Sequence, residues 1–258
     1  MNLPELSANY IYSILIIFCR VGSILMFAPG IGETLIPTRI KLLFSLLFTI
    51  MVIPIVVSIS GNITLPGSLI ELGLNIAIEI VIGSFIGLFL KIIFSAVNTL
   101  GFTISNVMGL SAATLVDPSQ DSQQGTLLGN FFTILSIVLI FAFGIDHDFI
   151  KGIITSYKIF RLGGSSEFYA DYTQSIIKVV NDTWMLGIKM AASFIVVGLL
   201  INIGGGILSR LMPQLHIFFL IIPLQALIGF FLLSITISSI MIWFIEQYKY
   251  HINMLFGQ

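Results

Sequence analysis

Long apolar runs separated by short polar breaks make up most of this chain. Residues 10–28 form a first run of membrane length, which ends at Pro29-Gly30, and a second run from Leu42 to Ile70 contains no Asp, Glu, Lys or Arg. At a rise of about 1.5 Å per residue, the second run is longer than a hydrocarbon core of about 30 Å. Because proline and glycine interrupt helices, we expect breaks near Pro54, at Gly61-Asn62 and at Pro66-Gly67.

Four more apolar segments follow the first two. They cover, in order, residues 70–98, a helix that ends near Phe143, residues 184–203 and residues 211–245. We expect Gly204-Gly205-Gly206 to loosen the third of these, Pro213 to break the start of the last and Pro223 to kink it. The pattern therefore predicts an all-α membrane protein with about six apolar segments.

The composition supports a membrane protein and excludes a nucleic-acid-binding one. Hydrophobic residues make up 57% of the 258 residues and charged residues only 9%, with a mean hydropathy of +1.08; soluble domains carry about 25% charged residues. The formal net charge is −1, so the chain lacks the basic surface that nucleic acid requires. Cys19 is the one cysteine, which rules out an intrachain disulfide.

Charge does not give an orientation in the membrane. Lysine and arginine residues fall on both sides of six predicted segments, whereas the positive-inside rule expects them to gather on one. Together with the overlong runs, this mixed distribution indicates that some apolar helices pack against other subunits and not only against membrane lipid.

The stretch from Ser105 to Gly125 is small, polar and turn-prone in the middle of apolar sequence. Irregular backbone cannot leave its polar groups unpaired in lipid, so we expect this loop to lie in a conduit lined by protein. Asp117 is expected to cap the next helix, with Pro118 at its first position and Gln120 at its third. The loop therefore indicates passage across a membrane rather than chemistry.

Residues 146–183 are the most polar part of the chain. An amphipathic helix is expected before the Gly163-Gly164 turn, and the section belongs at an aqueous surface. Asp146-His147-Asp148 has residue types that bind metals, but neighbouring helical residues diverge by about 100°. We therefore expect a helix cap and a solvated turn here, with no metal site.

Two ionisable residues, Arg20 and Glu79, lie inside apolar segments. Such residues in a membrane protein are either functional or paired between helices or subunits, and both interpretations stay open here. Glu79, Gly83 and Gly87 are four residues apart, which places them on one helix face where another helix can approach closely. The usual motifs for nucleotide hydrolysis, zinc proteolysis and acyl transfer do not occur, so we expect no enzyme and no cofactor.

Three stretches together resemble one family. They are residues Arg20–Leu42, Met108–Ser119 (MGLSAATLVDPS) and Leu208–Leu224 (LSRLMPQLHIFFLIIPL). They are similar to the flagellar export-apparatus FliR family and its counterparts in virulence type III secretion systems, over about residues 10–245.

The resemblance implies an architecture. Tilted, broken helical hairpins would form a helical export-gate assembly with FliP-type and FliQ-type subunits, next to FlhB-type and FlhA-type export proteins. Residues 1–183 would be FliP-like and residues 184–258 a FliQ-like hairpin, within one integrated membrane domain.

The resemblance also assigns residues. Its channel plug loop falls on eleven consecutive residues: Met108, Gly109, Leu110, Ser111, Ala112, Ala113, Thr114, Leu115, Val116, Asp117 and Pro118. Arg210, Pro213 and Gln214 match a second motif, which we expect at a tight turn between hairpin helices. With Glu79, Gly83 and Gly87, these three are expected to make contacts between helices or subunits.

The function expected from these features is a non-enzymatic subunit of the flagellar type III export gate. It would help to form and plug the channel for unfolded flagellar proteins across the bacterial inner membrane, in the flagellar basal body. The alternatives are a virulence secretion homologue, a stand-alone secondary transporter that uses Glu79 and Arg20, and an intramembrane enzyme.

Overall fold

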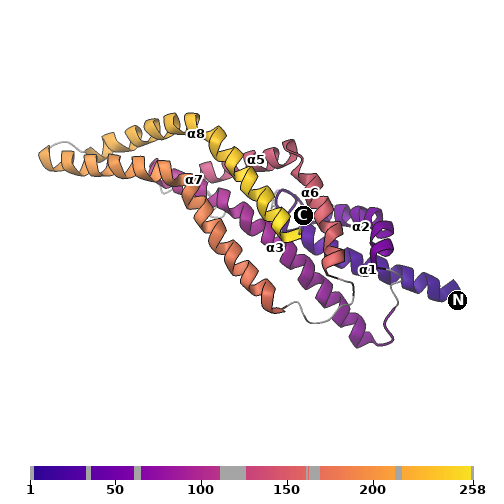
Figure 1. Cartoon of the computed structure of the whole chain (residues 1–258). Helices are drawn as coiled ribbons and strands as arrows, with labels where there is room; N and C mark the ends of the chain where they lie inside the picture. The colour runs from indigo at the N-terminus through magenta and orange to yellow at the C-terminus, as the bar shows by residue number, and fades with distance from the viewer. Residues whose placement is uncertain are drawn as a thin grey trace. The chain divides into compact units, whose positions relative to one another are not determined.

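The computed structural model describes most of the chain. The described residues are 3–32, 36–60, 65–110, 126–160, 162, 169–212 and 217–256. Every regular element among them is an α-helix: α1 (Leu3–Phe27), α2 (Thr38–Ser60), α3 (Leu69–Val107), α5 (Leu127–Ala142), α6 (Ile145–Ile159), α7 (Tyr169–Leu211) and α8 (Ile217–Phe256) (Figure 1).

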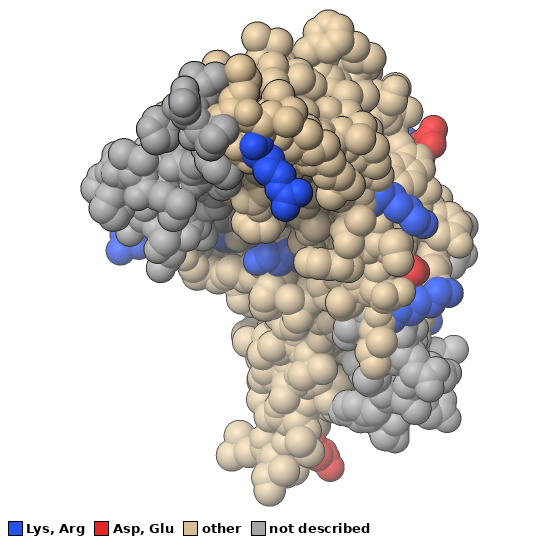
Figure 2. All heavy atoms as spheres, turned by 90° about the vertical axis from the view of Figure 1, so that its left-hand side faces the viewer, with Lys and Arg blue, Asp and Glu red and all other residues tan. Residues whose placement is uncertain are grey.

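The all-α membrane class predicted from the sequence is confirmed. Five of the described helices, namely α1, α2, α3, α7 and α8, are long and apolar enough to cross a membrane. The shorter α5 and α6, separated by a break at Gly144, add a sixth span if they are counted together. In the view of Figure 2, charged side chains are few and scattered among uncharged residues.

The predicted break near Pro54 is wrong, because α2 runs through this proline without interruption. Proline removes one backbone donor from a helix, but ending the helix would leave several unpaired backbone groups at each new end. In apolar surroundings those groups have no water to bind. A continuous helix that contains the proline therefore has a lower free energy than a helix broken there. Pro223 also lies inside a continuous helix, α8, and the kink expected there stays a prediction.

The triple glycine Gly204-Gly205-Gly206 does not loosen its segment as expected, since α7 continues through it to Leu211. A Cβ atom built on Gly205 would overlap the side chain of Ile221 in α8, whereas Gly204 and Gly206 face open space. Gly205 therefore lets α7 and α8 approach each other closely.

Three helices are about twice as long as a membrane core requires. Helices α3, α7 and α8 have 39, 43 and 40 residues, which at about 1.5 Å per residue gives about 60 Å for each, against a hydrocarbon core of about 30 Å. Part of each helix must therefore lie outside the hydrocarbon, in water or against protein.

The chain divides into two compact units that are interleaved in sequence. The first comprises Met1–Ile93, Phe143–Val179 and Lys249–Gln258, and its core is built where α1 packs on α2 and α2 on α6. The second comprises Phe94–Ala142 and Val180–Tyr248, which contain the end of α3, α5 and most of α7 and α8. The division at residue 183 that the family resemblance suggests stays a prediction.

Candidate functional site

Helix α3 ends at the predicted plug loop in a Schellman motif. The Leu110 N–H donates to the Ser105 carbonyl at 3.0 Å, and the Gly109 N–H donates to the Asn106 carbonyl at 3.2 Å. Gly109 has a φ of 71°, the left-handed conformation that this motif requires and that glycine adopts without strain. The helix therefore stops at a defined place, with its last carbonyl groups hydrogen-bonded.

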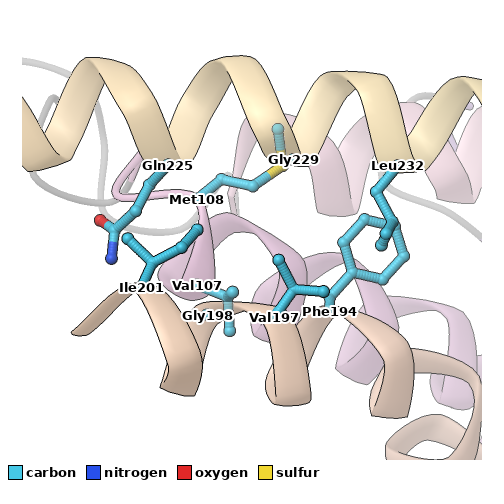
Figure 3. Close-up of a pocket in the computed structure, with 9 residues that line it drawn as sticks. All are labelled: Val107, Met108, Phe194, Val197, Gly198, Ile201, Gln225, Gly229 and Leu232. Atoms are coloured by element: carbon cyan, nitrogen blue, oxygen red, sulfur yellow. The ribbon is translucent and has the colours of Figure 1, made fainter. Parts of the chain in front are cut away.

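Met108, at this end of the loop, packs against α8 within the second unit. Its side chain is 1% exposed and lies against Gly229 of α8, where a Cβ atom would overlap Met108 Cγ, Sδ and Cε. Phe194 and Val197 of α7 line the same small cavity (Figure 3). The cavity of about 10 Å³ has room for about one water molecule, so the methionine nearly fills the space.

Two amide side chains are hydrogen-bonded between α7 and α8, and one of them, Gln225, lines the same cavity as Met108. The Gln225 Nε2 of α8 donates to the Asn202 Oδ1 of α7 at 2.7 Å, and Gln225 Oε1 is the nearest atom to a Cβ built on Gly109, at 3.3 Å. We did not predict either amide, although an Asn and a Gln inside apolar runs are the sequence signal that could have indicated them. Gln225 therefore links α8 to α7 by a hydrogen bond and leaves little space for a side chain at position 109.

Replacing Gly229 with leucine is expected to displace Met108, because no space exists for the added side chain. Overpacking of this kind costs about 1–3 kcal/mol. The thermal midpoint of the purified chain in detergent should fall by several degrees, at about 2–4 °C per kcal/mol. Gly206→Leu is the matched control, since a Cβ on Gly206 meets no atom within 4 Å; equal effects of the two substitutions would contradict the packing argument.

Several predicted site residues lie outside the described residues. These are Ser111 to Pro118 of the plug loop, together with Pro213 and Gln214. Arg210 is described: it is exposed in the last turn of α7, where a cation interacts favourably with the helix dipole.

Arg20 and Glu79 form a buried ion pair between α1 and α3 in the first unit. The Arg20 Nε donates to Glu79 Oε2 at 2.5 Å, and the two side chains are 0% and 1% exposed. Arg20 Nη1 also donates to the carbonyls of Ser156 and Phe160 at the end of α6, and the guanidinium lies 4.3 Å from the ring centroid of Tyr157. One side chain thus connects three helices.

The glycines on the Glu79 face lie against α1. A Cβ on Gly83 would overlap the Arg20 carbonyl oxygen, and one on Gly87 would lie 2.7 Å from Phe27 Cβ. The absence of side chains at these two positions brings α1 close enough for Arg20 to reach Glu79. Within the described part of the chain, Arg20 Nη2 and Glu79 Oε1 have no hydrogen-bond partner.

The acidic residues around His147 lie in the first turn of α6. His147 Nδ1 is 3.2 Å from Asp146 Oδ1, and Lys151 Nζ is 4.0 Å from Asp148 Oδ1, with the histidine and lysine side chains well exposed. Asp146 and Asp148 therefore interact with near neighbours and with the positive end of the helix dipole.

The sequence of the chain matches one known family along nearly its whole length. The profile of the family described as bacterial export proteins, family 1, matches residues 11–250. The chain is 33% identical over 243 residues to the flagellar biosynthetic protein FliR of Caulobacter vibrioides, covering 94% of this chain and 95% of that protein. It is 26% identical over 236 residues to FliR of Aquifex aeolicus, covering 92% and 89% of the two chains. It is also 27% identical over 167 residues to the Yop proteins translocation protein T of Yersinia pestis, covering 63% and 62%.

Proposed function

Because this chain belongs to family 1 of the bacterial export proteins, we propose that it is a non-enzymatic subunit of the flagellar type III protein export gate. It is a membrane-embedded component of a type III export apparatus. Its part in that apparatus is to form the channel with neighbouring subunits and to close it with the loop that begins at Met108.

The flagellar system is favoured over a virulence system by the level of sequence identity. The flagellar relative from Caulobacter vibrioides is 33% identical to this chain, whereas the Yersinia pestis translocation protein is 27% identical over a shorter match. The membrane concerned is then the bacterial inner membrane, at the flagellar basal body. The cargo is unfolded flagellar protein.

The main support for assigning this loop as the channel plug is the well-defined end of α3. A loop can close a channel only if at least one end is held firmly, and the Schellman motif at Gly109 with the buried Met108 provides such a hold. The residues that follow, from Ser111 to Thr114, are small, as a segment that must fit into a narrow conduit requires. The fixed end and the small residues after it together support the assignment.

The exposed surface of the helices supports the presence of neighbouring subunits. Helices α7 and α8 expose large apolar side chains such as Leu200, Leu211, Phe219 and Phe231, over lengths of about twice a hydrocarbon core. Lipid can cover only part of this surface. We assign the rest to FliP-type and FliQ-type subunits, with FlhB-type and FlhA-type proteins as further partners in the apparatus.

Deletion of Gly109 to Ala113 tests the plug. The shortened chain should still copurify with FliP-type and FliQ-type subunits, because its helices are unchanged, while the membrane should leak small solutes. The measurement is the uptake of an otherwise impermeant small solute by cells that carry the shortened chain.

The matched control is the same deletion in a strain that lacks the FliP-type subunit, where no channel forms and no leak is expected. A membrane that stays tight although the shortened chain copurifies normally would show that this loop is not the plug.

A further inference from the structure

Trp243 of α8 lies at the level of Phe94 in α3, within the second unit. The residue after it, Phe244, packs its ring on that of Phe94, with the two centroids 6.3 Å apart. Residues 217–245 of α8 contain no Asp, Glu, Lys or Arg, and the next residue, Glu246, is exposed. Charge on this helix therefore begins one turn beyond the tryptophan.

Trp184 of α7, the second of the two tryptophans in the chain, lies at the same level. A Cβ on Gly187 would be 2.8 Å from Thr99 Cβ in α3, and further along both helices a Cβ on Gly198 would overlap Val107. Helices α3 and α7 therefore run in the same direction. One turn before Gly187, Trp184 lies one turn before Thr99, which is the level of the aromatic pair between α3 and α8.

Charge on α7 follows the same pattern as charge on α8. Asp182 comes two residues before Trp184, and the helix then carries only Lys189 until Arg210, which is exposed in its last turn. Residues 184–210 of α7 and 217–243 of α8 each measure about 40 Å at about 1.5 Å per residue. A bilayer with its head-group regions measures about 40–45 Å, so the two lengths match it.

The outward side chains between these limits suit hydrocarbon. Leu199 and Phe231 are 60% and 66% exposed, and other large apolar residues accompany them on both helices. Uncharged polar side chains also face outward here, but several are hydrogen-bonded within the unit. The Ser234 hydroxyl donates to the Phe231 carbonyl at 2.7 Å, and Asn202 accepts from Gln225. Hydrogen bonds of this kind lower the cost of polar groups in lipid.

We propose that Trp184 and Trp243 lie among the lipid head groups of one leaflet, and that the hairpin of α7 and α8 spans the bilayer from this level to Arg210. An indole ring suits this boundary, because its apolar body can lie in hydrocarbon while its N–H binds water or head groups. Apolar sequence alone does not locate the boundary, since the candidate spans Ile177–Leu211 and Phe219–Phe256 extend past both tryptophans.

Lys189 supports the same boundary. It is exposed and lies about 7 Å deeper than Trp184 along α7. Its Cα–Cβ bond points towards the start of the helix, and a lysine side chain can carry its ammonium to the head-group phosphates while its methylene groups stay in hydrocarbon. A boundary at residue 177 would instead leave the ammonium about 18 Å from the head groups, beyond the reach of the side chain.

Nitroxide labels in the full chain measure this depth. After Cys19→Ser, the variants Trp184→Cys and Trp243→Cys are labelled, and the chain is placed with its copurifying subunits in nanodiscs of phosphatidylethanolamine and phosphatidylglycerol. The accessibility of each label to oxygen, which enters hydrocarbon, is compared with its accessibility to a water-soluble nickel complex. The Cys19→Ser chain alone gives the background from other subunits.

Four further labelled positions calibrate the scale. Leu199→Cys and Phe231→Cys are expected deep in hydrocarbon, and Asp182→Cys and Glu246→Cys in water. The ratio of oxygen to nickel accessibility should be at least about ten times higher at the first two than at the second two, because oxygen concentrates in the hydrocarbon core and the nickel complex does not. Positions 184 and 243 should lie between these limits and within about twofold of each other, since one leaflet boundary holds both.

Each other result would overturn the proposal. Labels at 184 and 243 that neither reagent reaches would show that protein covers this level and would assign it to a subunit interface. Ratios equal to those at 199 and 231 would place the boundary further out, and ratios equal to those at 182 and 246 would place it nearer Arg210. None of these results bears on the export function or on the plug, which the deletion of Gly109 to Ala113 tests separately.

Discussion

Replacing Arg20 with leucine is expected to destabilise the fold strongly, because Glu79 then stays buried without its cation. Removing one partner of a buried ion pair costs about 3–5 kcal/mol. The change also removes the donor to the Phe160 carbonyl and the cation that lies over the Tyr157 ring. The thermal midpoint of the purified chain in detergent should fall by roughly 10 °C, at about 2–4 °C per kcal/mol.

The double variant Arg20→Leu with Glu79→Leu should recover most of this loss. A buried ion pair exchanged for apolar side chains of similar volume is often neutral in stability, since no buried charge is left alone. Lys91→Leu, which removes an exposed cation from α3, is the matched control and should have a small effect. If the double variant is as unstable as Arg20→Leu, the pair itself is not what stabilises this site.

Gly83→Leu should separate α1 from α3 and lower stability by about 3 kcal/mol. The added side chain would meet the Arg20 carbonyl oxygen and Ser23 Cβ, the second at 2.8 Å from the new Cβ, and backbone atoms cannot move aside as a flexible side chain can. Because the two helices would move apart, Arg20 would also lose its short contact with Glu79. Thermal unfolding of the chain in detergent, with and without the substitution, measures the effect.

Gly73→Leu provides the comparison in the same helix. Gly73 lies in α3 with no atom within 4 Å of a Cβ, so leucine there adds helix propensity of about 1 kcal/mol without a clash. The expected result is a stable or slightly stabilised chain. A loss at Gly73 equal to that at Gly83 would mean that leucine disturbs α3 generally, and the close approach at Gly83 would not be the cause.

The apolar runs predicted most of the helices but not their ends. Local hydropathy locates a helical segment because each apolar side chain adds to the hydropathy of that segment independently, whether the helix faces lipid or protein. The break expected at Pro54 and the loosening expected at Gly204 to Gly206 are both wrong, since the helix-weakening effect of proline and glycine is largest where water can bind the backbone groups of an opened helix. In apolar surroundings α2 and α7 continue through them.

The candidate site could be predicted only in part. The sequence indicated the polar loop after α3 and the Glu79, Gly83 and Gly87 face, because both are local patterns. It did not indicate that Met108 packs on Gly229 or that Gln225 binds Asn202, because these residues are far apart in the chain. In the sequence, a glycine that packs against a methionine, such as Gly229, cannot be distinguished from one that faces open space, such as Gly206.

The sequence by itself determined the all-α membrane class, the approximate apolar segments and the export family. The tertiary structure decided which surfaces meet: that the helix beside Gly83 is α1, and that the cation for Glu79 is Arg20, 59 residues away. The physical reason is that a helix forms from contacts within a few residues, whereas the pairing of two helices depends on their rotation and on close packing between side chains distant in sequence.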